Sequence, residues 1–194
     1  MMTYMHQIQT CGYKLIAVIF TGIALLLLII GVAAADWVDV KFVSVKDGWR
    51  SWGLWEECYD VTSSLTACVK KDWMSACAAL TLLSVFGAVG ALGLGIFGLC
   101  THKRVLYIIA GVLTAVGALF ILISVIIFPV KFSEDISEAH RSDLERYDID
   151  WTYGVTLGGL FFLLGASIFF FIKQEDQEVS REKTSMPAYY NNSY

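Results

Sequence analysis

The residues best placed for covalent chemistry are two of the five cysteines, Cys58 and Cys68, which share one polar segment with nine residues between them. This spacing suits a small hairpin closed by a disulfide, and such a bridge would place the segment in an oxidising compartment. A disulfide that closes so short a loop stabilises a fold by about 2–3 kcal/mol. A zinc site is the weaker alternative, because no histidine lies in this segment to complete a ligand set.

The other three cysteines have different settings. Cys77 lies inside a long apolar segment, where a cysteine most often packs as a small buried hydrophobe. Cys11 and Cys100 lie near the ends of two apolar segments, where a thiol is either idle or S-palmitoylated. Both possibilities stay open for these two residues.

The remaining polar residues do not form a recognisable catalytic set. No segment combines a nucleophile, a base and an orienting group, and the apolar segments contain no carboxylate or histidine. We therefore expect no enzymatic activity, no cofactor and no metal site. A calcium site is a minor alternative that lacks the glycine-punctuated ligand pattern, and its candidate ligands are Glu134, Asp135, Glu138, Asp143 and Glu145.

Four apolar segments must position these residues. Each is free of charged residues and long enough to cross a hydrocarbon core of about 30 Å as a helix. The chain is 57% hydrophobic and only 16% charged, which is typical of membrane proteins. The expected division is an N-terminal segment at 1–14, spans at 15–35, 73–101, 105–130 and 151–172, loops at 36–72 and 131–150, a turn at 102–104, and a tail at 173–194.

The orientation of these spans rests on the cysteines. Basic residues do not decide it, because the two large loops hold eight of them and the rest of the chain holds six. If Cys58 and Cys68 are bridged, both loops are extracellular and both termini are cytoplasmic. The net charge of -4 makes nucleic acid a poor partner.

The first loop carries an ordered pattern. Trp37 is followed after 17 residues by Trp55, within Gly53-Leu54-Trp55, and then by the two loop cysteines. This pattern resembles the signature of the claudin and peripheral myelin protein 22 superfamily. The resemblance implies a claudin-like fold, α+β overall, in which a membrane four-helix bundle carries a small extracellular antiparallel sheet. Alternation of Val38 and Val40 with Asp39 independently favours a strand at the start of this loop.

Two further segments narrow the resemblance. The sequence FPVKF at 128–132 and the sequence DWTYG at 150–154 are similar to segments of the branch that contains PERP, a desmosomal tetraspan protein, and transmembrane protein 47. Asp150 replaces the asparagine usual in that branch. Claudins commonly have an arginine soon after the second cysteine and end in Tyr-Val, whereas this chain ends in Asn-Ser-Tyr. Pro129 marks the expected end of the third span, and residues 133–147 are a possible helical continuation of it.

Tryptophans and glycines supply candidate contact residues. Trp37, Trp73 and Trp151 flank spans and suit an interfacial belt. Trp49 and Trp52 lie outside the family signature and are candidates for a partner surface. Small residues allow close approach of helices, either within one chain or between two, and the candidates are Gly87, Ala91, Gly95, Gly154 and Gly158.

The resemblance and the topology together predict a non-enzymatic tetraspan protein of cell–cell junctions in the plasma membrane. Its expected partners are membrane lipids, other tetraspan or junction proteins in cis or in trans, and cytoplasmic adaptors that bind the tail, with a homo-oligomer as a further possibility. Two alternatives stay open. One is an auxiliary subunit of a channel or receptor, and the other is a claudin-type paracellular barrier or pore.

Overall fold

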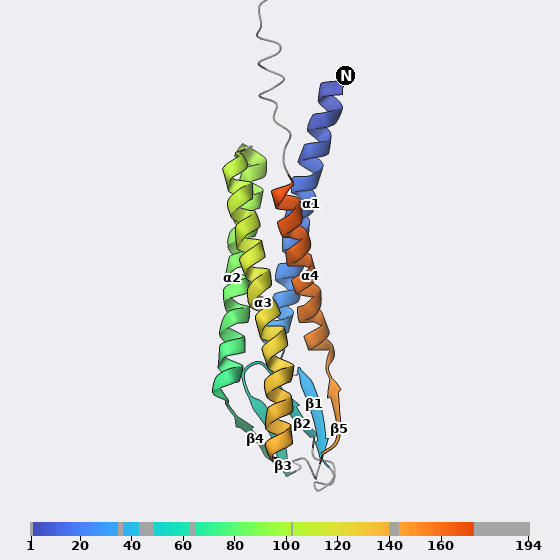
Figure 1. Ribbon diagram of the computed structural model, residues 1–194, viewed down its shortest axis with the longest axis vertical. Coiled ribbons are helices and arrows are strands. Elements are labelled where there is room, and N and C mark those ends of the chain that lie inside the picture. The colour runs from blue at the N-terminus through green and yellow to red at the C-terminus, as the bar shows by residue number, and fades with distance from the viewer. Residues whose placement is uncertain are drawn as a thin grey trace, which may run out of the picture.

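The computed structural model describes residues 2–34, 37–42, 49–62, 65–101, 103–139 and 144–172. Four long helices run side by side: α1 (Met2–Ala33), α2 (Asp72–Thr101), α3 (Arg104–Ala139) and α4 (Trp151–Phe171). Each contains a stretch long and apolar enough to cross a membrane. In the resulting bundle α2 packs mainly on α3, and the first helix packs mainly on the last (Figure 1).

A single antiparallel sheet lies at one end of the bundle, which we call the sheet end (Figure 1). Strand β1 (Val38–Phe42) lies between β2 (Trp49–Trp52) and β5 (Leu144–Ile149). Next to β2 come β3 (Glu57–Thr62) and the edge strand β4 (Leu65–Val69), so that the order is β4-β3-β2-β1-β5. The predicted fold class, a membrane four-helix bundle with a small antiparallel sheet, is confirmed.

Two helices extend further than the sequence analysis assigned them. Helix α1 begins at Met2 rather than near residue 15, so its first turns project beyond the opposite end of the bundle, which we call the terminal end (Figure 1). Pro129 does not end α3, which continues to Ala139 beside the sheet. The segment expected as a possible helical continuation is therefore divided between this α3 extension, residues 130–139, and the edge strand β5.

Small residues bring the helices together, although not all of the predicted ones do so. Ala91 is fully buried, and a Cβ atom on Gly95 would come within 2.9 Å of Val18 and 3.1 Å of Phe170. Cβ atoms on Gly87 and Gly158 would make ordinary contacts at 3.6 and 3.5 Å. Gly154 is different, because a Cβ there would meet no described atom within 4 Å. Close approaches that the sequence analysis did not single out occur at Gly31, Gly111, Gly117, Gly159 and Gly165.

Candidate functional site

The sheet rests on the bundle through seven aromatic side chains, which we call the aromatic cluster. They come from both sheet and helices, and they are Trp37, Trp52, Trp73, Phe128, Phe132, Tyr147 and Tyr153. Ring centroids lie 4.8 Å apart for Trp37 and Phe128 and 5.1 Å apart for Trp52 and Phe132. Such tilted and edge-to-face pairs stabilise a fold beyond their buried area alone. The cluster therefore fixes the sheet against α2, α3 and α4.

Two tryptophans of the family signature cap the end of α1. Trp37 donates its indole N–H to the carbonyl oxygen of Gly31 at 3.0 Å, and Trp55 donates its own to that of Val32 at 2.8 Å. A helix leaves its last four carbonyls without partners inside the helix, and unpaired groups are costly near lipid. Trp37 and Trp55 are 18 positions apart in the first loop, yet both indoles bind carbonyl oxygens at the end of the same helix.

The loop backbone is tied to the same place. The amide of Trp37 donates to the carbonyl oxygen of Trp52 at 2.9 Å, and the amide of Asp150 donates to that of Trp37 at 3.0 Å. Asp150 also caps α4, because its carboxylate accepts a hydrogen bond from the amide of Trp151 at 2.8 Å. Leu54, between the glycine and tryptophan of the signature, is fully buried. The signature residues therefore join β1, β2 and the start of α4 around the end of α1.

The continuation of α3 past Pro129 has a specific support. Proline has no N–H, so the carbonyl oxygen four residues earlier, that of Val125, receives no bond from the Pro129 backbone. The Tyr153 hydroxyl donates to this Val125 oxygen at 3.0 Å. Tyr153 and Pro129 belong to the two segments that resemble the PERP branch, so these segments meet and stabilise an uninterrupted helix. Sequence reasoning identified both segments but not this contact.

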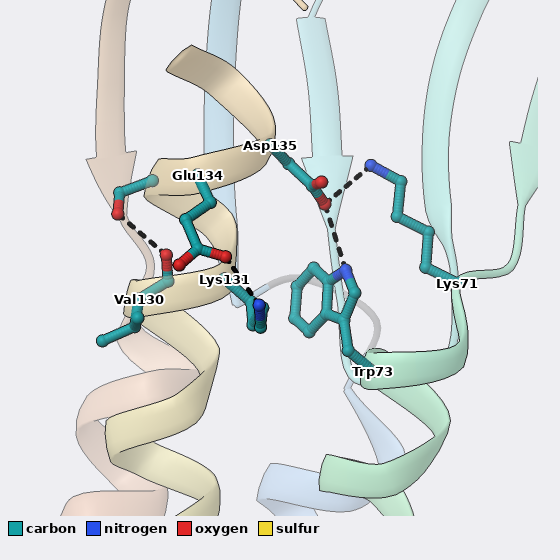
Figure 2. A network of polar contacts seen from close by, with 7 residues as sticks. Lys71, Trp73, Val130, Lys131, Glu134 and Asp135 are labelled. Atoms are coloured by element: carbon teal, nitrogen blue, oxygen red, sulfur yellow. Dashed lines mark hydrogen bonds and ion pairs between the residues drawn. The ribbon is translucent and has the colours of Figure 1, made fainter. Parts of the chain in front are cut away.

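A polar group at the sheet end connects α2 to the α3 extension. Asp135 accepts a charge-assisted hydrogen bond from Lys71 at 2.9 Å and one from the indole N–H of Trp73 at 3.0 Å (Figure 2). The Lys71 ammonium also lies 4.3 Å from the centroid of the Trp52 ring, a cation–π distance. We call Lys71, Trp73 and Asp135 the latch. It joins α2 to α3 beyond the apolar span, next to the aromatic cluster.

Removal of the latch is expected to lower stability measurably. Asp135→Ala removes the acceptor of both Lys71 and Trp73, whose side chains are partly buried, and should cost about 1–2 kcal/mol. Glu134→Ala is the matched control, because that carboxylate makes an exposed i,i+3 pair with Lys131. Thermal unfolding in detergent micelles measures both variants. Equal midpoints for the two would show that the latch contributes no more than a surface ion pair.

The two loop cysteines occupy paired backbone positions on neighbouring strands of the sheet. Cys58 of β3 and Cys68 of β4 are directly opposite in the antiparallel register, where Cβ atoms lie about 4.5–5.5 Å apart. This placement supports the predicted disulfide. Cys77 is a free, buried thiol as expected, and Cys100 is a free, exposed thiol at the terminal end. The Cys11 side chain lies outside the described residues.

Several predicted roles need correction. Trp52 is only 3% exposed and packs against Phe132, so it belongs to the core rather than to a partner surface. Trp37 is fully buried rather than part of an interfacial belt, whereas Trp151 is 62% exposed. The Trp49 side chain lies outside the described residues. Strand alternation could not reveal which face the α3 extension would cover, and this extension is what buries Trp52.

The calcium alternative also finds no support. Two of its candidate ligands, Glu134 and Asp135, are each paired with a lysine. The side chains of Glu138, Asp143 and Glu145 lie outside the described residues. Where side chains are described, no three of the potential metal-ligating residues come together.

Four apolar helices with a small sheet at one end define a multi-pass membrane protein of the tetraspan class. Residues 60–172, more than half of the chain, match the sequence profile of the family described as PMP-22/EMP/MP20/Claudin tight junction. The chain belongs to this family. It is also similar to the zebrafish (Danio rerio) protein named p53 apoptosis effector related to PMP-22, with 28% identity over 175 residues that cover 88% of this chain and 86% of that protein. This similarity supports the predicted PERP branch.

Proposed function

We propose that this protein is a structural component of cell–cell junctions in the plasma membrane. The observation that carries the proposal is the sheet at one end of the four membrane spans. The aromatic cluster, the indole hydrogen bonds of Trp37 and Trp55 and the latch all fix this sheet to the helices. A preorganised surface loses little conformational entropy when it binds a partner. The family description, which includes the tight junction, agrees with this role.

The proposed orientation has the sheet outside the cell and both termini in the cytosol. Its support is the register that places Cys58 opposite Cys68, because a structural disulfide needs an oxidising compartment. The exposed Cys100 then lies at the cytoplasmic end, where S-palmitoylation is chemically accessible. Cys11 precedes the first span on the same side.

The proposed partners follow from this orientation. Lipids cover the apolar helix faces, and other tetraspan or junction proteins, including a second copy, contact the sheet in cis or in trans. Cytoplasmic adaptors bind the tail at 173–194. The protein is proposed to act without enzymatic activity, in keeping with the membership of its family.

Localisation in a confluent epithelium tests the proposed function. We expect the tagged full-length protein to concentrate where cells touch, relative to a lipid-anchored fluorescent protein that reports membrane area. The control is the same pair of proteins in sparse cells, which have free edges. Uniform surface staining, with a channel or receptor recovered in stoichiometric amounts on purification, would instead favour the auxiliary-subunit alternative.

A further inference from the structure

Lys14 of α1 is a buried charge at the terminal end of the bundle. Its side chain is 6% exposed, and it is the one buried Lys, Arg, Asp or Glu where side-chain burial is described. A lysine near the end of a membrane span ordinarily extends its ammonium toward water. Here the ammonium points into the protein instead and donates to carbonyl oxygens of Phe170 at 2.8 Å, Ile172 at 2.9 Å and Phe169 at 3.4 Å. Its three donors are matched by three acceptors.

Two of these acceptors, Phe169 and Phe170, belong to the last turn of α4, which ends at Phe171, and the third, Ile172, is the C-cap residue of that helix. The final carbonyls of a helix have no partners within the helix and carry the negative end of the helix dipole. The last turn of α4 contains no basic residue of its own. The Lys14 ammonium of α1 therefore supplies a positive charge and hydrogen-bond donors to the end of α4, although Lys14 and Phe170 are 156 residues apart in the sequence.

Residues of the other three helices surround the Lys14 ammonium. It lies 5.3 Å from the centroid of the Tyr107 ring, and that ring stacks on Phe170 at 6.4 Å. Gly98 leaves space for Tyr107, since a Cβ on this glycine would come within 2.9 Å of the ring. Helices α1, α2, α3 and α4 thus all contribute to the place where the cation sits.

We propose that the Lys14 side chain caps the C-terminal end of α4 and so joins the first and last helices where the tail leaves the bundle. Sequence reasoning counted Lys14 only among the six basic residues outside the two large loops, a count that did not decide the orientation of the spans. In the folded protein it instead stabilises the last turn of α4, and its loss frays that turn without changing the orientation.

Hydrogen–deuterium exchange of the full-length protein in lipid nanodiscs tests this role. Lys14→Met keeps an unbranched side chain, one atom shorter, but removes the charge and the donors, and should speed exchange of the amides of residues 170–172 by about tenfold or more. Lys103→Met is the matched control, because Lys103 is an exposed lysine at the same end of the bundle. It removes the same charge and should leave these amides unchanged.

Two results would overturn the proposal: wild-type exchange in Lys14→Met, or the same acceleration in both variants. If Lys14→Met does not accumulate as folded protein, Lys14→Arg and Lys14→Gln replace it. Arginine retains the cation and its donors and should protect the last turn of α4 better than glutamine. Equal exchange at residues 170–172 in these two variants would exclude a cationic cap.

Discussion

Trp37→Ala is expected to destabilise the protein by about 3–5 kcal/mol, the usual cost of truncating a large buried aromatic side chain. The indole is fully buried between Phe128 and Tyr153. Its N–H also satisfies the carbonyl oxygen of Gly31 at the end of α1. The substitution therefore creates a cavity in the aromatic cluster and leaves a carbonyl unpaired, and its effect should reach both the sheet and the helices.

Thermal unfolding in detergent micelles measures this effect, with the buried thiol of Cys77 as a reporter of unfolding. The reporter background carries Cys11→Ser and Cys100→Ser so that accessible thiols do not contribute. Trp151→Ala is the matched control, because Trp151 is 62% exposed at the start of α4. Its midpoint should stay near that of the parent. If both tryptophan variants unfold at similar temperatures, the aromatic cluster is not the support that holds the sheet.

Replacement of Cys58 and Cys68 together by serine should trap the protein in the secretory pathway. The cysteines are opposite one another in β3 and β4, and loss of a bridge that closes this hairpin costs about 2–3 kcal/mol. Cell-surface biotinylation measures the fraction delivered to the plasma membrane. Peptide mapping of the parent under non-reducing conditions should recover the two cysteines in one linked fragment.

The single variants distinguish a bridge from two independent roles. If the cysteines are bridged, Cys58→Ser and Cys68→Ser should each reduce surface delivery as strongly as the double variant does, because either change removes the whole bond. Additive losses would indicate that each thiol acts alone. Normal delivery of the double variant would remove the disulfide from the fold and, with it, the argument for orientation.

The broad architecture could be predicted because it depends on local properties of the sequence. The four apolar segments identify the four membrane spans directly, and alternation of Val38 and Val40 with Asp39 indicates a strand that buries one face. Helix ends were less predictable. Pro129 ordinarily stops a helix, and only the hydrogen bond from the Tyr153 hydroxyl to the carbonyl oxygen of Val125, 28 residues earlier in the chain, shows why α3 continues.

The site was only partly predictable for the same reason. The signature around Trp37 and Trp55 could be recognised as a pattern, but its physical role depends on where α1 ends in space. Trp52 lies on a short strand whose sequence does not reveal that the α3 extension covers it. In the sequence Asp135 is one of several acidic residues of the second loop. Only the structure shows that it accepts hydrogen bonds from Lys71 and Trp73 at the start of α2.

Because β1 pairs with β5, the sheet can be completed only late in the synthesis of the chain. Strand β1 leaves α1, whereas β5 leads into α4, and these are the first and last helices of the described chain. Until residues 144–149 have been made, β1 has one open edge, and an open edge is a template for wrong pairing. The nascent protein therefore holds an unfinished sheet while two helices, α2 and α3, are inserted into the membrane. Synthesis of β5 and then of α4 completes the sheet and the bundle one directly after the other, so a chain that stops before residue 144 is left with one unpaired edge of β1.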